Sequence, residues 1–227
     1  RWVKDVPGLQ AIMPHIMINR TGAEVYLHDT IDITQLQSYL EKKNAEHPEY
    51  KTTLFHCIVT GLSRMVTERP MMNRFIQGRR TYERDEITIG FVCKRRFTDH
   101  AEEALMFLKA KPEDTIDSIS KRIIGDVHET RKSESSTGGV DELMDTLAKL
   151  PRPILMAFIR VIRWLDFWGL NPDFITAGDP NYASIFLSNL GSIKCPSVYH
   201  HLNNYGTNSM MITIGTIHKE EIIMEDG

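Results

Sequence analysis

The amino-acid sequence predicts an α+β protein, with a mixed or antiparallel sheet and helices packed on it. Two observations support this fold class. Apolar and polar residues alternate along the short segments 23–27 and 87–93, as half-buried strands require. Apolar residues recur with the spacing of a helix along 55–66 and 116–127. Strand-like and helix-like segments are therefore interspersed along a chain of 227 residues.

Two helices are expected after the first strand. From Thr34 the apolar residues recur every three or four positions, which predicts a helix that ends near His47. Thr52 or Thr53 can cap a second helix with its side-chain oxygen. That helix carries the clearest apolar stripe of the chain, and Pro70 ends it. The stripe consists of Phe55, Ile58, Val59, Leu62, Met65 and Val66. His56, one step from the stripe, is expected to be a partly buried histidine with satisfied hydrogen bonds.

A β-hairpin and a further strand are expected next. Gln77-Gly78 separates two short extended segments, 74–76 and 79–82, and a two-residue loop that ends in glycine favours a tight hairpin. The alternating segment 87–93 then predicts a strand.

In the second half of the chain, the apolar stripe along 116–127 predicts a helix. A flexible loop is expected over 133–139, and a short helix over 141–150. After a third helix over 154–168, the segments 184–188 and 210–217 are expected to be strands.

The predicted helix over 154–168 has an unusually wide apolar face. Its charged residues, Arg160, Arg163 and Asp166, are three positions apart and fall on one arc of roughly 120°. The rest of the circumference is apolar, and the stretch is too short to span a bilayer. A protein core, a subunit interface or a membrane surface could cover such a face, and these alternatives remain open.

Composition excludes several classes of protein. The net charge of −3 gives no general electrostatic case for binding nucleic acid or an acidic membrane. The three cysteines form no CxxC pair, which argues against a disulfide-stabilised secreted domain and favours a cytoplasmic location. The sequence contains no P-loop, no GxGxxG, no HExxH and no GxSxG motif. No metal site is therefore expected.

Three segments carry a resemblance to a known family. The first is 23–34 (AEVYLHDTIDIT), followed by a helix that ends in EKKN, and the second is 53–82, which includes RPMMNRFIQGRRTY. The third begins at 185–191 (IFLSNLG) and continues through 211–217 to the final IHKEEIIMEDG. In this order and spacing they resemble the acyltransferase domain of 2-oxoacid dehydrogenase complexes. That family shares its fold with chloramphenicol acetyltransferase. The resemblance implies one acyltransferase-like domain over 1–227, incomplete at its C-terminal end.

The resemblance implies acyl transfer between coenzyme A and a thiol or hydroxyl acceptor. In this chemistry a histidine acts as the general base, and a hydroxyl group stabilises the oxyanion of the tetrahedral intermediate. The hydroxyl maps to Ser188 in IFLSNLG. The alternative is that Ser188 only makes a hydrogen bond to a nearby backbone group.

The sequence gives two candidates for the general base. The family's HxxxDG motif would follow Gly227. His201, in the segment 200–206 (HHLNNYG), is a second candidate, because HHxxxDG motifs carry the base in chloramphenicol acetyltransferases. Against it, Tyr205 replaces the aspartate, and the motif follows Ser188 too closely. The alternative is a loop whose imidazoles bond to the backbone or lie at a subunit contact.

The resemblance also implies partners and leaves two rival functions. A homotrimer, or an assembly of trimers, would have active sites between subunits, with coenzyme A or acyl-CoA as substrate. The acceptor would be the dihydrolipoyl group of a partner lipoyl domain or a small molecule. No residue is assigned to coenzyme A binding. The rivals are a non-catalytic trimeric relative and a membrane-surface protein that uses helix 154–168.

Overall fold

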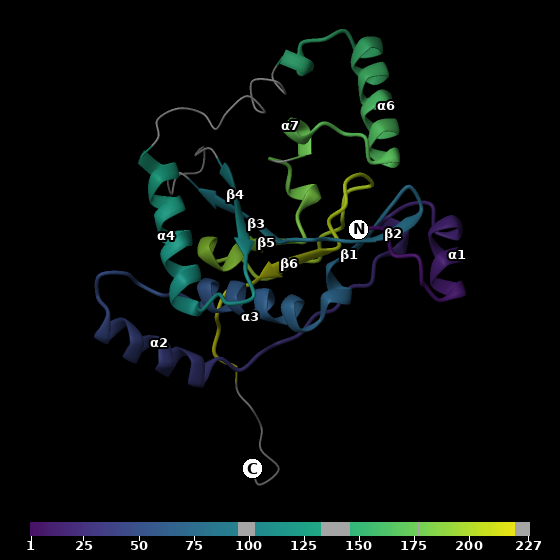
Figure 1. Ribbon diagram of the computed structural model, residues 1–227. Helices are drawn as coiled ribbons and strands as arrows, with labels where there is room; N and C mark the ends of the chain where they lie inside the picture. The colour runs from purple at the N-terminus through teal and green to yellow at the C-terminus, as the bar shows by residue number, and fades with distance from the viewer. Residues whose placement is uncertain (95–102, 133–145, 177, 221–227) are drawn as a thin grey trace.

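The computed structural model describes residues 1–94, 103–132, 146–176 and 178–220 (Figure 1). Its helices are α1 (Gly8–Ile16), α2 (Thr34–Glu46), α3 (Leu54–Glu68), α4 (Ile116–Lys132), α6 (Arg152–Trp168) and α7 (Asp173–Thr176). Its strands are β1 (Arg74–Gln77), β2 (Arg80–Glu83), β3 (Ile87–Lys94), β4 (Glu103–Ala110), β5 (Ile185–Asn189) and β6 (Met210–Ile214).

The main sheet has four strands in the order β4-β3-β5-β6. β3 pairs with β4 in antiparallel orientation, and β5 runs parallel to both β3 and β6. Ile185 of β5 lies opposite Ile89 on one side and Met210 on the other. The predicted α+β class with a mixed sheet is therefore confirmed.

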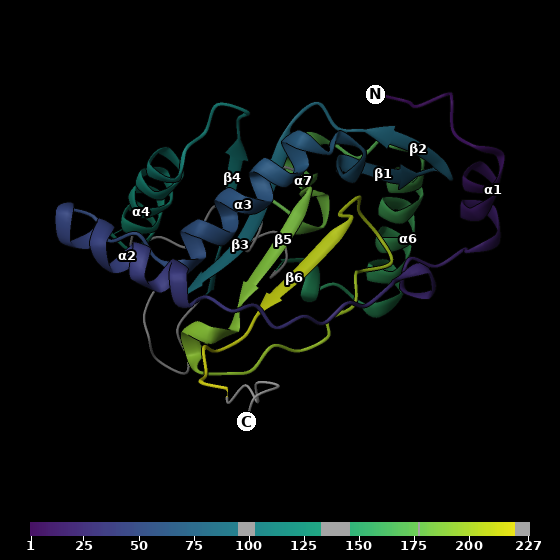
Figure 2. The ribbon, with the colours of Figure 1, turned by 90° about the horizontal axis from the view of Figure 1, so that it is seen from below.

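On one face of the sheet α3 and α4 pack near β3 and β4, whereas α6 and α7 lie on the other side (Figures 1 and 2). Alternate residues of the strands point to the α3–α4 side and form the core. The core consists of Val59, Val66, Ile89, Phe91, Met106, Leu108, Ile119, Ile123, Ile185 and Leu187.

The predicted helices over 34–47 and 54–70 form as α2 and α3. Thr53 precedes the first residue of α3, and its backbone N–H donates a hydrogen bond of 2.9 Å to Nδ1 of His56. The imidazole takes the place that glutamate or glutamine has in a capping box. His56 is buried with this bond satisfied, and burial lowers its pKa below the ordinary value.

His56 should make the stability of the protein depend on pH. A histidine with a lowered pKa in the folded state stabilises the fold above about pH 6.5, and this contribution is lost as pH falls. Protonation would also remove the acceptor from Nδ1. We expect His56→Gln, which retains an acceptor, to reduce the loss of unfolding free energy between about pH 7.5 and about pH 5.5.

Urea unfolding at several pH values measures this effect. His128→Gln, which changes an exposed histidine of α4, is the matched control and should retain the wild-type pH dependence. Equal pH slopes for wild type and His56→Gln would contradict the prediction.

The predicted β-hairpin forms one residue later than expected. β1 and β2 are joined by Gly78 and Arg79, whose φ values of 55° and 63° are those of a type I′ turn. A Cβ on Gly78 would lie 2.8 Å from the carbonyl oxygen of Phe167. In addition, Gln77 Nε2 donates a 2.9 Å hydrogen bond to the carbonyl of Asp166. The hairpin therefore holds the C-terminal end of α6.

Two sequence predictions about strands need correction. The segment 23–27 is not a strand, and Val25 and Leu27 are 94% and 89% exposed. Alternation alone was a poor guide, because this segment has no sheet edge to pair with in the described part of the chain. Conversely, β4 was not predicted from its residues, which are mostly helix formers. Its alternate residues Ala104, Met106, Leu108 and Ala110 are nevertheless buried.

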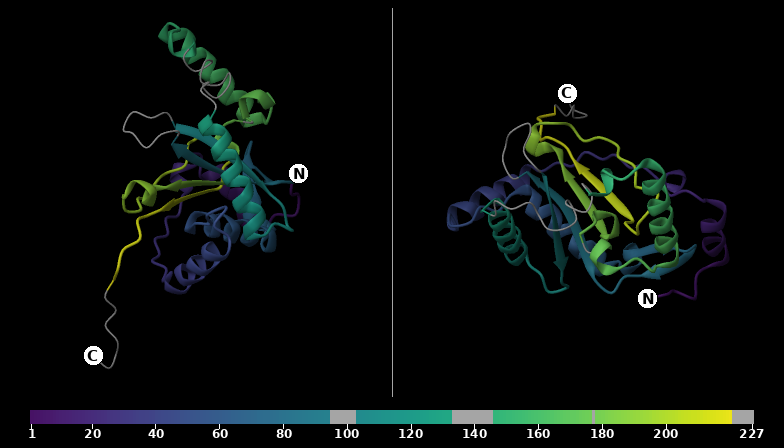
Figure 3. Two further views of the ribbon diagram at one scale, coloured as in Figure 1. Left: turned by 90° about the vertical axis from the view of Figure 1, so that its left-hand side faces the viewer. Right: turned by 90° about the horizontal axis from the view of Figure 1, so that it is seen from above.

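The helix predicted over 154–168 forms as α6, but it is not a core helix. It stands away from the sheet (Figure 3, left), and most of its large apolar side chains are exposed. Only Asp166 is fully buried. Within the described ranges no helix is long and apolar enough to cross a membrane. The loop expected over 133–139 and residues 141–145 of the helix expected over 141–150 lie outside the described residues.

Candidate functional site

Ser188 lies on β5 and faces away from the α3–α4 core. Ile185 and Leu187 of the same strand are fully buried in that core, so Phe186 and Ser188 point to the opposite side. Gly90 on the neighbouring strand lies opposite Phe186. A Cβ on Gly90 would come within 3.3 Å of the Phe186 ring and 3.5 Å of the Phe107 ring, so glycine makes room for both aromatic side chains.

The Ser188 hydroxyl makes no hydrogen bond to any residue that the structure describes. Its neighbour across the strand pair, Thr213 of β6, is different. Thr213 Oγ1 donates a 2.7 Å hydrogen bond to the carbonyl oxygen of Val198. Among the described residues, therefore, no hydrogen-bond partner occupies the half-buried Ser188 hydroxyl.

His201 lies in the loop between the turn at Leu190–Ile193 and β6. Its side chain is exposed, and its Nδ1 is 3.0 Å from the carbonyl oxygen of Leu202. His200 Nδ1 is likewise 2.7 Å from the carbonyl oxygen of His201. Because a carbonyl can only accept, these contacts fit the tautomer with the proton on Nδ1, in which Nε2 keeps its lone pair.

The structure does not join His201 to Ser188. Within the described residues, no hydrogen bond or ring contact links the two side chains. The loop is instead attached to the N-terminal segment, where Glu24 Oε1 accepts a 2.6 Å hydrogen bond from the backbone N–H of Leu202. Among the described residues of one chain, therefore, Ser188 and His201 are separate groups, and neither the Ser188 hydroxyl nor His201 Nε2 makes a hydrogen bond.

A buried polar cluster forms around Asp166, in the last turn of α6. Oδ1 accepts hydrogen bonds from the hydroxyl of Tyr182, at 2.7 Å, and from Asn171, at 3.3 Å. Oδ2 accepts a 3.1 Å bond from the backbone N–H of Gly206. Burial and the hydrogen bond to Asp166 both raise the pKa of Tyr182 above its ordinary value.

Tyr205 and Gly206, the last two residues of the HHLNNYG segment, both take part in this region. The Tyr205 hydroxyl lies 2.9 Å from Asn181 Nδ2, and burial raises the pKa of Tyr205 to about 12. Asp179 accepts bonds of 2.9 Å and 2.6 Å from Asn181, although burial still raises the pKa of its carboxyl group. The carboxylates beside this loop are therefore Asp166 and Asp179, from outside the motif.

Arg84, just after β2, holds three segments together. Its guanidinium donates to the carbonyl oxygens of Tyr182, Ala183 and Thr207, at 2.9, 3.2 and 2.6 Å, and to the Thr207 hydroxyl, at 2.9 Å. It also lies 4.5 Å from the centre of the Phe75 ring. Burial, together with the positive charge of Arg20, lowers the pKa of Arg84 to about 10. Arg84 remains charged at neutral pH.

Arg20 makes a second set of backbone contacts from the N-terminal segment. It donates to the carbonyl oxygen of Tyr205, at 2.6 Å, and to that of Asn208. Burial lowers its pKa, although the charges of Asp166 and Glu24 act in the opposite direction. Arg20 and Arg84 thus fix the loop between β5 and β6 from two sides.

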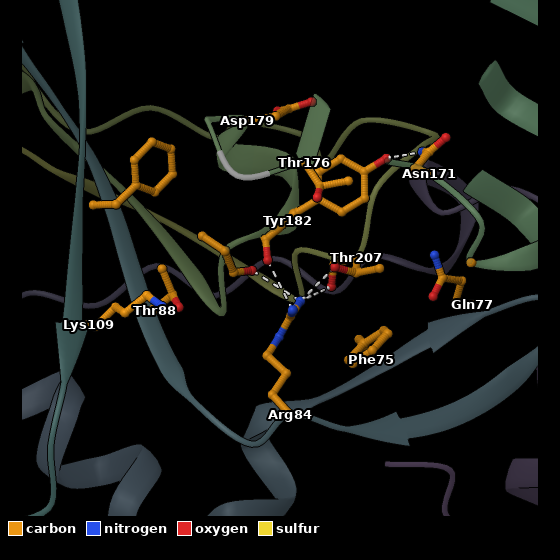
Figure 4. A pocket seen from close by; sticks show the side chains of 13 residues that line it. Phe75, Gln77, Arg84, Thr88, Lys109, Asn171, Thr176, Asp179, Tyr182 and Thr207 are labelled. Atoms are coloured by element: carbon orange, nitrogen blue, oxygen red, sulfur yellow. Dashed lines mark hydrogen bonds between the residues drawn. The ribbon is translucent and has the colours of Figure 1, made fainter. Parts of the chain in front are cut away.

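A pocket of about 410 Å³ lies beside this cluster (Figure 4). Aromatic rings and polar side chains both line it, and Arg84 is among them. Its lining consists of Phe75, Gln77, Arg84, Thr88, Phe107, Lys109, Gly169, Asn171, Thr176, Asp179, Tyr182, Ala183 and Thr207. Its volume is in the range of small-molecule sites. Neither Ser188 nor His201 lines it.

The region around the polar cluster contains hydrogen-bond donors and the positive charges of Arg20 and Arg84. In the ranges the structure describes, no group of three or more histidine, cysteine or acidic side chains could hold a metal ion. Among the described residues, the Ser188 hydroxyl and the imidazole Nε2 atoms of 200–201 are groups that make no hydrogen bond. A hydroxyl can stabilise developing negative charge, and an imidazole can accept a proton.

The sequence analysis identified Ser188 and His201 but missed the polar cluster. Asp166 was interpreted only as part of the charged arc of a helix. Arg84, Tyr182 and Asn171 carry no motif, and they come from segments that are far apart in the sequence. The only local signal was one acidic residue in an otherwise apolar and basic helix.

No protein-family model and no curated protein sequence matches the chain. Solved structures do match. A probable dihydrolipoamide acetyltransferase from Listeria monocytogenes is 16% identical, with a TM-score of 0.57 over 99% of this chain and 80% of the other. The dihydrolipoamide acetyltransferase of Azotobacter vinelandii is 13% identical, with a TM-score of 0.56 over 99% of this chain and 76% of the other.

A third match is the cubic core of a pyruvate dehydrogenase multienzyme complex. It is 12% identical, with a TM-score of 0.57 over 99% of this chain and 76% of the other. The study of the Azotobacter enzyme concerns a serine, a histidine and an asparagine in its catalytic mechanism. The similarity predicted from three short segments is confirmed for the fold: this chain has the fold of dihydrolipoamide acetyltransferase catalytic cores.

Proposed function

We propose that the protein is an acyltransferase that moves an acyl group between coenzyme A and the thiol or hydroxyl of an acceptor. The observation that carries this proposal is the Ser188 hydroxyl, which has no hydrogen-bond partner among the described residues and lies on the sheet face opposite α3 and α4. The fold shared with dihydrolipoamide acetyltransferase cores adds support.

In the proposed reaction, the acceptor's oxygen or sulfur attacks the thioester carbonyl while a general base takes its proton. The carbonyl oxygen becomes negatively charged in the tetrahedral intermediate, and the Ser188 hydroxyl donates a hydrogen bond to it. The intermediate then collapses: the C–S bond to coenzyme A breaks, the acyl group stays on the acceptor, and the thiolate of coenzyme A takes up the proton.

We propose two candidates for the base. His201 presents a free Nε2, since its Nδ1–H is engaged with Leu202. The other candidate is a histidine in an HxxxDG motif after Gly227. Either histidine could act on a neighbouring copy, because active sites between subunits need not join the two groups within one chain.

We further propose that the protein is a homo-oligomer, with a trimer as the building unit. Its support is apolar surface that one chain leaves uncovered. Val25, Leu27 and Ile31 of the extended segment and Leu9, Ile12 and Ile16 of α1 are all exposed. The fold is also that of the core of a multienzyme complex. Light scattering of the full-length protein should give a mass of three chains or a multiple of three, and a monomer would contradict this proposal.

The acceptor is proposed to be a dihydrolipoyl group or a small molecule. A thiol-release assay tests the activity: full-length protein is mixed with acetyl-CoA and with dihydrolipoamide or a panel of small alcohols and thiols. Release that depends on the acceptor and falls in Ser188→Ala supports the proposal.

A protein that forms trimers but releases no coenzyme A with any acceptor would favour the non-catalytic alternative. A protein whose release is unchanged in Ser188→Ala would contradict the proposed role of this hydroxyl.

A further inference from the structure

Helix α6 exposes most of its large apolar side chains to solvent. Trp164 and Trp168 are each 59% exposed, and Ile154, Met156, Ile159 and Val161 are about half exposed. Patches of this kind on a protein surface mark sites of interaction.

The exposed side chains of α6 are not scattered. Ile154, Val161 and Trp168 are seven residues apart, and Ala157 and Trp164 fall between them. At 3.6 residues per turn these five positions form one stripe along the helix. An apolar stripe of four turns therefore faces outward.

The helix cannot turn this stripe inward without breaking its own anchor. Asp166 is buried in the polar cluster, and its carbonyl accepts the hydrogen bond from Gln77. Phe158, Ile162 and Leu165, on the anchored side, are half-buried. The outward direction of the stripe is therefore fixed by the fold.

The charge of the exposed surface of α6 is entirely positive. Arg152, Arg160 and Arg163 are exposed, and none of them pairs with a carboxylate in the described part of the chain. The one acidic residue of the helix, Asp166, is buried and directed away from solvent. An apolar stripe beside arginines that pair with no carboxylate of the described residues thus forms a surface that we call the α6 face.

We infer that the α6 face binds the surface of a membrane that contains anionic lipids. The arginines complement the phosphate and carboxylate groups of such lipids, and tryptophan side chains favour the boundary between headgroups and acyl chains. A second copy packed helix to helix on the same face would instead bring the arginines of both copies together without an acidic partner. The positive charge therefore favours lipid as the occupant.

Co-sedimentation of the full-length protein with vesicles tests this inference. We expect binding to vesicles of phosphatidylcholine with phosphatidylglycerol, little binding to phosphatidylcholine alone, and weaker binding as salt is added. Each arginine contributes about fivefold near an anionic surface, so Arg160→Gln with Arg163→Gln should weaken binding roughly 25-fold. Trp164→Ser with Trp168→Ser should weaken it on the same vesicles.

Matched controls alter similar residues elsewhere. Lys42→Gln with Lys51→Gln removes two exposed cations, and Met71→Ser with Met72→Ser removes two exposed apolar side chains that follow α3. Both should leave vesicle binding at the wild-type level. In a Trp2→Phe background only the two tryptophans of α6 fluoresce, and their emission should shift to shorter wavelength on binding.

Three outcomes would overturn the inference. The first is a wild-type protein that does not bind anionic vesicles at low salt, and the second is equal binding by wild type and the α6 variants. The third is that Trp164→Ser with Trp168→Ser changes the number of chains per particle, which would show that a second copy covers the stripe. None of these outcomes depends on acyltransferase activity.

Discussion

Ser188→Ala is expected to lower the turnover of acyl transfer about 100-fold or more. Removing one hydrogen-bond donor to an oxyanion costs on the order of 10²–10³ in rate, because the donor acts where negative charge develops. The expected stability change is small, since the hydroxyl makes no hydrogen bond to the described residues. Coenzyme A release from acetyl-CoA, measured at saturating acceptor, gives the effect on turnover directly.

Thr213→Val provides a matched control for this substitution. Thr213 lies opposite Ser188 on the same face, but its hydroxyl is already engaged with the carbonyl of Val198. Its loss should change turnover by no more than a few fold. If Thr213→Val lowered turnover as much as Ser188→Ala, the loss would come from any change in this strand pair and not from the missing serine hydroxyl.

His201→Ala, measured in the same assay, separates the two candidate bases. If turnover falls with Ser188→Ala but not with His201→Ala, the base lies elsewhere, as an HxxxDG motif after Gly227 would provide. If His201→Ala also abolishes turnover, His201 is the base.

Asp166→Ala is expected to lower the free energy of unfolding by about 3–5 kcal/mol. The carboxylate accepts hydrogen bonds from Tyr182, Asn171 and Gly206, and a buried donor left without an acceptor costs about 1–3 kcal/mol. Arg20 would also lose its largest favourable charge interaction. Urea unfolding, followed by circular dichroism, measures the change.

Asp173→Ala is the control for Asp166→Ala, because Asp173 is an exposed carboxylate in the short helix α7. It should change stability by no more than about 0.5 kcal/mol. Asp166→Asn should fall between the two, since an amide retains one acceptor oxygen. Equal stabilities of Asp166→Ala and Asp173→Ala would mean that the polar cluster does not support the fold.

The elements that the sequence predicted well are those with one buried face. In α3, β3 and α4 the apolar period matches the residues that contact the core, because burial selects side chains at that spacing. The segment 23–27 has the right alternation but no partner strand, so its pattern was not enough. β4 has a partner but lacks β-branched residues, so its pattern was overlooked.

From the sequence, a site residue could be predicted only where it stands in a recognisable motif of a single strand. Ser188 is such a residue. Arg84, Asp166 and Tyr182 meet because α6, the β2–β3 connection and the turn before β5 converge, and no local spacing records that convergence. Asp166 is also an exception to the rule that charged helix residues face solvent. Its hydrogen bonds allow it to be buried, while large apolar residues of the same helix are exposed.

The parallel pairing of β5 has a consequence for how the chain is made. Ile89 pairs with Ile185, so the edge of β3 that β5 covers stays unpaired until β5, almost a hundred residues later, has left the ribosome. Pairing between segments so distant in sequence is slow, and an unpaired apolar edge favours aggregation while it persists. A nascent chain that ends before β5 is therefore a natural client for chaperones.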